Sequence, residues 1–196
     1  MNISAENNLK KELAAARAEG LPLELEDVFK PVTDQQNAAS LYQRVFPLLE
    51  ETKRERQAFK QNETLTPVRI PELALLLRRS EKVLLLLEDA AAKPYCQFNR
   101  DYSLGFDVLF PEFVLMKEAV RLLCLKARYE VHTGQGSRAV KTLRTAYRVA
   151  EHSGQDPILI AMLVRIANEV IVLKEVELLL SHQKHAIQVL REVDDL

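Results

Sequence analysis

Apolar side chains recur at spacings of three and four residues along most of this chain, and no other feature restricts its fold as strongly. One such stripe follows Asp34 and comprises Ala38, Leu41, Tyr42, Val45, Leu48 and Leu49. This period is that of an amphipathic α-helix with one buried face. Glycine occurs only five times in 196 residues, whereas sheet-rich folds need many turn residues. The sequence therefore predicts an all-α fold of about seven helices in antiparallel hairpins.

We expect a single helical domain over residues 1–196. Asp34 is the expected N-cap of a long helix near the N-terminus. Pro71 suits the first turn of a leucine-rich helix. The expected parts are N-terminal helices over 1–61, the leucine-rich helix with an aromatic loop over 71–109, and a tetratricopeptide-like hairpin with the C-terminal helices over 110–196.

Two predicted helices are expected to be covered on more than one side. The leucine-rich helix over 71–92 has an apolar face that is widened by Leu75, Leu85 and Leu86. The helix over 158–181 is apolar nearly all round, and Asp156 is its expected N-cap. We therefore expect the helix over 158–181 to be central in the fold.

The overall charge and the cysteines exclude several classes of protein. A net charge of −1 gives no field that would attract nucleic acid or an anionic membrane. The best apolar run, residues 158–164, is too short to span a membrane. At face value the chain is cytoplasmic, although a chain whose export signal had been removed would look the same. Cys96 and Cys124 form no CxxC motif, so we interpret them as small buried residues, and a disulfide would require export.

An aromatic-rich loop over residues 95–109 interrupts the helical pattern. Its aromatic side chains include Tyr95, Phe98, Tyr102 and Phe106. One interpretation is a plug that covers the end of the helical core. The alternative is that these four side chains form the ligand pocket of a binding protein for a small apolar molecule, against the leucine-rich helix. An enclosed cavity would favour the second interpretation, and a filled core would remove it.

Residues 123–150 resemble a tetratricopeptide-type repeat. The small residues that this motif needs where its two helices cross are Ala127, Ala139 and Ala146. Gly134 stands in the turn, and Leu143 fills the large apolar position of the second helix. The closing proline is displaced to Pro157. The resemblance implies a helical-repeat array in which flanking helices cover the hairpin.

The order of segments along nearly the whole chain is similar to a broad family of uncharacterised bacterial proteins. The shared elements are residues 37–42, 96–98, 101–102, Gly134 and 160–166. Members of that family often carry an N-terminal export or anchor segment, and many continue further. The resemblance therefore implies an extracytoplasmic, longer protein, and it implies no chemistry because the family has no known function.

Few residues are candidates for catalysis or metal binding. His182 and His185 share one helical face, but a metal site needs a third ligand at least. Asp101 and Asp107 could act as a general acid–base pair in a hydrolase, although aspartate in a loop commonly forms turns. No Ser–His–Asp, Cys–His or phosphate-loop spacing occurs. We therefore predict a protein that is not an enzyme and that has no cofactor or metal.

Charge placement is the sharpest functional signal in the chain. Residues 117–148 contain eight basic and two acidic side chains, a net charge of +6. Residues 169–196 reverse the balance, with six acidic and three basic side chains. The basic residues on one helical stripe are Arg138, Lys141, Arg144 and Arg148, and Arg121 and Arg128 lie on the preceding helix.

Arginine and lysine bind carboxylates well, and arginine clusters recognise acidic motifs. We therefore predict a scaffold or adaptor whose basic stripe binds an acidic peptide or protein surface. Nucleic acid is not expected, because no aromatic side chains interleave with the basic ones. The alternatives are that the stripe is a solvated face, or that it pairs with the acidic residues of the C-terminal part.

Overall fold

The computed structural model describes residues 3–23, 27, 32–59, 63, 65–102 and 108–181. The chain divides into two compact units, residues 1–32 and 33–196. In the first unit, helix α1 spans Ile3–Ala18 and ends before Gly20, whose φ of 76° favours glycine. Leu9 and Leu13 of α1 are exposed to solvent.

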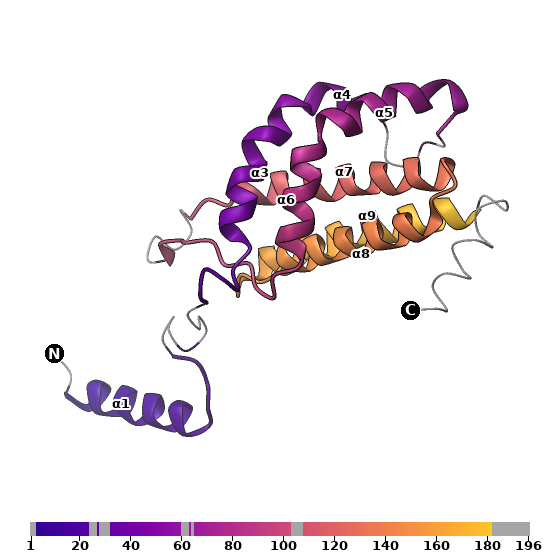
Figure 1. The fold of residues 1–196 in the computed structure, drawn as a ribbon. Coiled ribbons are helices and arrows are strands. Elements are labelled where there is room, and N and C mark those ends of the chain that lie inside the picture. Colours follow the sequence, from indigo (N-terminus) through magenta and orange to yellow (C-terminus); the bar gives the residue numbers. More distant parts are fainter. Residues whose placement is uncertain are drawn as a thin grey trace. The chain divides into compact units, whose positions relative to one another are not determined.

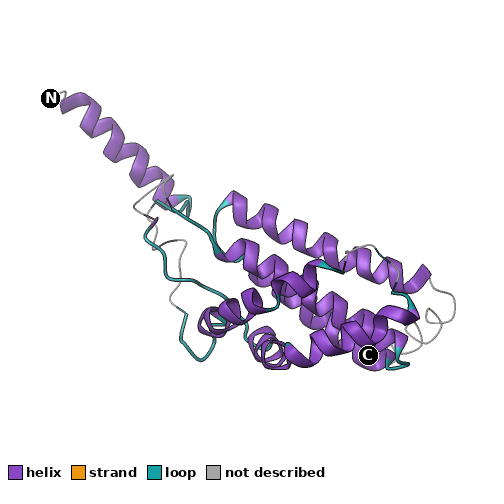
Figure 2. Cartoon of the chain, turned by 90° about the horizontal axis from the view of Figure 1, so that it is seen from above, coloured by secondary structure: helices purple, strands orange, loops and turns teal. Residues whose placement is uncertain are grey.

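The described residues of the second unit are built from helices. They form α3 (Ala39–Glu51), α4 (Lys53–Gln57), the short 3-10 helix η1 (Pro67–Arg69), α5 (Ile70–Arg79), α6 (Glu81–Ala91), α7 (Glu112–His132), α8 (Gly136–His152) and α9 (Leu159–Ser181). One isolated bridge joins Asn37 to Tyr95, and no strand occurs among the described residues. The prediction of an all-α protein is confirmed, and Figure 2 shows helices joined by loops.

Three long helices form the base of this unit. α7, α8 and α9 pack against one another, α6 lies against α3 and α8, and α3 and α5 contact α7 (Figure 1). The largest fully buried apolar side chains include Leu73, Leu87, Met116, Leu122 and Leu123. Removing these side chains from water is the main favourable contribution to folding.

A tight turn joins α7 to α8. Gly134 has a φ of 75°, and its N–H donates to the carbonyl of Val131 at 3.0 Å. The N–H of Gln135 donates to the carbonyl of Glu130 at 2.7 Å, so two of the last carbonyls of α7 are satisfied. The helices approach closely because small residues lie between them, namely the fully buried Ala127, Ala139 and Ala146.

Two predicted helix boundaries are wrong. α3 begins at Ala39 rather than after Asp34, because the residues that follow Asp34 form a turn. The side-chain oxygen of Asn37 accepts the N–H of Ala39 at 3.1 Å, so Asn37 serves the start of α3. The single helix predicted over 71–92 is divided at Ser80 into α5 and α6.

The division at Ser80 also changes which leucines are covered. Leu75 and Leu85, expected to be buried, are 59% and 56% exposed, whereas Leu86 is buried. The helical period does not continue across the break, so leucines on either side of Ser80 do not share one continuous face.

α9 is not the central helix that its composition predicts. Its exposed large apolar side chains are Leu159, Ile160, Met162, Leu163, Ile166, Val170 and Leu173. Its opposite face packs on α7 and α8 through residues such as Ile171, Val172 and Leu179. An apolar composition therefore does not reveal on how many sides a helix is covered. Among the described helices, none has both the length and the hydropathy needed to cross a membrane.

Candidate functional site

A groove of about 800 Å³ lies between α8 and the α5–α6 pair, and α7 also contributes to it. Its lining residues are Leu77, Arg78, Glu81, Leu84, Leu85, Glu88, Lys126, Tyr129, Glu130, Gln135, Arg138, Lys141, Thr142 and Thr145. We call this set of residues the basic groove. It brings Arg138 and Lys141 of the predicted stripe together with Arg78, which the sequence analysis did not single out.

One cation of the basic groove is held by groove carboxylates. The Nζ of Lys126 lies 3.3 Å from Glu88 and 3.0 Å from Glu130, and it donates a hydrogen bond to Thr142 at 2.9 Å. The hydroxyl of Thr142 in turn donates to Glu130 at 2.7 Å. This network commits two of the three carboxylates of the groove and fixes α6, α7 and α8 to one another there.

The other cations of the basic groove are not matched by carboxylates. Arg138 donates to the side-chain oxygen of Gln135 at 2.8 Å. The side chains of Arg78 and Lys141 form no hydrogen bond or ion pair with the part of the chain that the structure describes. Three exposed cations therefore face a single uncommitted carboxylate, that of Glu81.

The basic groove also has an apolar part. Leu77 and Leu84 are buried in it, and Tyr129 is half-buried. Leu85 keeps 56% of its surface exposed, although it lies beside the buried leucines. A concave surface with apolar side chains and a few charged groups is the usual character of a binding site.

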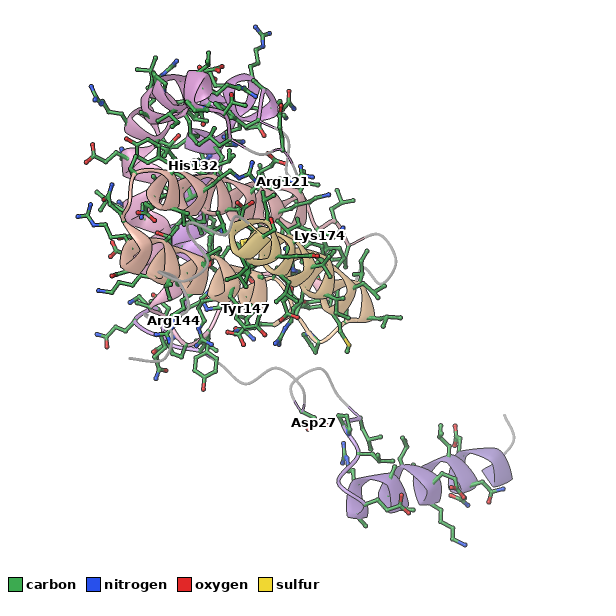
Figure 3. The ribbon with its side chains drawn as sticks, turned by 90° about the vertical axis from the view of Figure 1, so that its right-hand side faces the viewer. Asp27, Arg121, His132, Arg144, Tyr147 and Lys174 are labelled. Carbon is green, nitrogen blue, oxygen red and sulfur yellow. The ribbon has the colours of Figure 1, made fainter. Side chains whose placement is uncertain are left out.

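The remaining stripe residues lie outside the basic groove. Arg144 is exposed on α8 without lining the groove, and Figure 3 labels it together with Arg121 of α7. Arg148 pairs with Glu151 at 3.0 Å, one helical turn further along α8. Arg121 pairs in the same way with Glu118 at 2.8 Å. Exposed pairs of this kind contribute little to stability, so they do not prevent Arg121 and Arg148 from meeting a partner.

Arg128 is a core residue, only 3% exposed. Its Nε donates to Glu175 of α9 at 2.8 Å, its Nη2 donates to the other oxygen of the same carboxylate, and its Nη1 donates to the carbonyl of Glu63 at 2.8 Å. Burial raises the pKa of Glu175, and the guanidinium of Arg128 opposes that change. Because this guanidinium joins α7 to α9 and does not reach the surface, we leave Arg128 out of the proposed binding surface.

A strap of residues 93–98 crosses the end of the helices. The side chain of Asn37 accepts the N–H of Gln97 at 2.9 Å and donates to the Gln97 carbonyl at 2.9 Å. The side-chain oxygen of Gln155 accepts the N–H of Cys96 at 2.6 Å. The strap is therefore held by side chains from before α3 and after α8, so it fixes α6 relative to both.

His152 lies beneath this strap. Its Nδ1 is 2.8 Å from the hydroxyl of Tyr42, and its Nε2 is 3.0 Å from the carbonyl of Lys93. A carbonyl only accepts, so Nε2 carries the proton and Nδ1 accepts from Tyr42. Burial, the largest influence, lowers the pKa of His152 to about 4. The imidazole is therefore neutral at neutral pH.

Among the described aromatic side chains of the 95–109 loop, Phe98 packs against α3. Phe98 stacks on Phe46 with ring centroids 6.1 Å apart, and it lies 6.5 Å from the ring of Tyr42. Tyr95 is 47% exposed, and Phe106 lies outside the described residues. The ligand pocket under this loop stays a prediction, since no described contact favours it over packing.

A buried charge cluster anchors the same loop. Arg100 donates to Asp156 at 2.8 Å and to Glu112, and all three side chains are less than 9% exposed. The hydroxyl of Tyr102 donates to the second oxygen of Asp156 at 2.9 Å. Asp156 was predicted to cap the following helix, which begins at Leu159, and that prediction is wrong because both carboxylate oxygens are used by the loop.

Cys96 and Cys124 are buried free thiols. Burial is the main cause that raises the pKa of each one far above its usual range. The thiolate is the reactive form of cysteine, so neither residue is a good nucleophile.

Of the other candidate catalytic or metal-binding residues, the structure describes Asp101 alone. Asp101 is exposed, and Asp107, His182 and His185 lie outside the described residues. Within the described ranges, no three His, Cys, Asp or Glu side chains gather closely enough to hold a metal ion.

The α5–α6 side of the basic groove was not predicted from the sequence. Arg78, Arg79 and Glu81 interrupt the leucine run on both sides of Ser80. That polar break was the signal that could have revealed a surface turn. It was missed because the leucines on either side match one continuous helical period.

The buried neutral imidazole predicts a loss of stability in acid. Histidine has a pKa near 6.5 in an unfolded chain, so between about pH 6.5 and pH 4 the unfolded state binds more protons. The neutral His152 contributes about 3 kcal/mol to the free energy of unfolding. This contribution is complete above about pH 6.5 and is lost as the pH falls through about pH 4. We therefore expect the free energy of unfolding, measured with denaturant, to fall between about pH 7 and about pH 5 by about 2 kcal/mol less in His152→Gln than in the wild type.

The wild type, measured in parallel at both pH values, provides the reference for this experiment. An unchanged pH dependence in His152→Gln would show that His152 is not the buried neutral group.

Comparison with known proteins does not assign a family. No known protein family, no curated protein and no solved structure matches this chain. The chemistry of the basic groove is therefore argued from its own residues.

Proposed function

We propose that this protein is a non-catalytic interaction module, a scaffold or adaptor, and that its basic groove binds an acidic peptide segment. The observation that carries the proposal is the surplus of uncommitted cations beside an apolar surface. Arg78, Arg138 and Lys141 face one free carboxylate, Glu81, next to the exposed Leu85.

These two features together define the peptide. Charge-assisted hydrogen bonds from arginine and lysine select carboxylate side chains. An exposed leucine that adjoins buried apolar residues gains by contact with an apolar side chain. The expected ligand is therefore a segment in which acidic residues alternate or cluster with leucine-like residues, and not a uniformly acidic one.

The supporting scaffold on this proposal is a degenerate repeat of the tetratricopeptide type. The buried alanines between α7 and α8 and the positive φ of Gly134 are consistent with such a hairpin. Arg144 and Arg148 continue the stripe along α8, and they extend the positive field beyond the groove. Their role is to attract an acidic partner, whereas the groove residues contact it.

The proposal predicts which peptides the protein selects from a random library. Enriched sequences should be rich in both acidic and leucine-like residues. Fluorescence anisotropy with an enriched peptide should give binding that weakens by about tenfold or more in the double variant Arg138→Glu/Lys141→Glu, because two attractive contacts become repulsive. Higher salt should also weaken the binding, since exposed charges are screened.

Arg144→Glu is the matched control, because it reverses an exposed charge of α8 outside the groove lining. We expect it to slow association without abolishing binding. Selection of peptides without acidic residues, or equal binding by the double variant and the wild type, would contradict the proposed site.

A further inference from the structure

A second cavity, of about 270 Å³, lies between α4, α7 and α9. Three guanidinium groups line it, those of Arg56, Arg121 and Arg128. The carboxylates of Glu118 and Glu175 also line it, and Phe59 contributes an apolar wall. We call this cavity the guanidinium pocket.

Arg56 has unsatisfied donors in this pocket. Its side chain is 3% exposed, and its Nη1 donates to the carbonyl of Leu49 at 2.6 Å and to the hydroxyl of Thr52 at 2.7 Å. Its Nε and Nη2 are buried and have no hydrogen-bond partner among the residues that the structure describes. Nη2 lies 3.5 Å from Glu118, an ion-pair distance that is too long for a good hydrogen bond. Buried donors without partners are rare in native proteins, so their presence points to a missing acceptor.

The charges of the pocket are also unbalanced. Glu175 is committed to Arg128, and Glu118 is shared by Arg121 and Arg56. The Nε of Arg121 is another buried donor for which the described part of the chain offers no hydrogen-bond acceptor. Burial lowers the pKa of Arg56, and the surrounding carboxylates, Glu118 foremost, only partly oppose this. Among the described residues that line the pocket, three cations thus face two carboxylates.

We propose that the guanidinium pocket binds a small organic carboxylate. The Nε and Nη2 of Arg56, which lack hydrogen-bond partners among the described residues, form the edge of a guanidinium that can hold a carboxylate through two parallel hydrogen bonds. The Nε of Arg121 supplies a third donor. One bound carboxylate balances the excess positive charge. Phe59 and Leu125 favour a ligand with a short apolar chain over a fully hydrated anion.

Isothermal titration calorimetry with acetate, butyrate and inorganic phosphate tests this proposal on the full chain. We expect one saturable site that binds butyrate more tightly than acetate, and phosphate more weakly than either. Arg121→Gln and Arg56→Lys should each weaken butyrate binding at least tenfold, and Arg44→Gln, an exposed arginine of α3, should not. Circular dichroism shows whether each variant is folded. If Arg56→Lys is unfolded, butyrate binding by Arg121→Gln alone tests the proposal. Absence of saturable carboxylate binding, or tightest binding of phosphate, would overturn the proposal.

The exposed apolar side of α9 supports a second, independent inference. Leu159, Leu163, Ile166, Val170 and Leu173 follow one another at alternating spacings of four and three, and each is at least 41% exposed. This spacing is the a/d pattern of helices that pack along their length. A contiguous row of exposed apolar side chains is typical of an interaction surface.

We propose that this side of α9 packs against α9 of a second copy of the chain, with the two helices antiparallel. A closed two-fold pairing buries the same apolar row of both copies at once. The orientation follows from Glu177, which takes the next position of the row. Parallel helices would place the two Glu177 carboxylates face to face. Antiparallel helices place each one beside the N-terminus of the other α9, where negative charge is favoured.

Sedimentation equilibrium tests the pairing. The wild type should be a dimer, and Ile166→Glu should be a monomer with unchanged helix content. Leu75→Glu, which changes a leucine of α5 that is even more exposed than Ile166, should remain a dimer. A monomeric wild type, or a dimer that tolerates Ile166→Glu, would overturn the inference.

Cross-linking tests the orientation. In the antiparallel pair, Leu163 faces Leu173 of the partner subunit, so a mixture of Leu163→Cys and Leu173→Cys proteins should form a disulfide between copies. Leu163→Cys alone should not, because its two copies lie about 15 Å apart along the helices. An efficient disulfide in Leu163→Cys alone would show that the helices are parallel.

Discussion

The position of His152 is the constraint on which the arrangement of the second unit depends. Its neutral ring accepts from Tyr42 of α3 and donates to the carbonyl of Lys93, directly after α6. One buried side chain of α8 therefore holds two other elements by hydrogen bonds. A charged imidazole could not accept from Tyr42, so burial and the low pKa of His152 are part of the same arrangement.

The basic groove follows from this constraint, because its two walls are α6 and α8. The strap over residues 93–98 begins where α6 ends, and Asn37 and Gln155 hold it in place. Within the groove, Lys126 bridges Glu88 and Glu130. On the far side of α7, the buried pair between Arg128 and Glu175 fixes α9. Basic residues of α7 and α8 thus have two roles. Exposed ones line the groove, whereas the buried Arg128 holds α9 in place.

Local patterns predicted much of the fold. Gly134 was expected in a turn between two helices and lies in the turn between α7 and α8, and the all-α class is confirmed. The contacts between distant residues could not be predicted. Arg100 donates to Asp156, and Tyr42 donates to His152. These partners lie far apart in the sequence, so no local spacing of residues indicates that they interact. The prediction that α9 is central was wrong for the same reason. The exposure of a helix face depends on which other helices pack against it, and a periodic pattern does not identify them.

For the candidate site, the sequence identified Arg138 and Lys141 but not Arg78 across the groove. It also grouped Arg128 with the surface cations, because helical position alone does not distinguish a buried arginine from an exposed one. The most direct test of the central claim is an NMR titration of the isotope-labelled protein with a library-selected acidic peptide. The account predicts that the largest amide shift changes occur around Arg78, Lys141 and Thr145. Changes confined to other surfaces, with these amides unmoved, would contradict it.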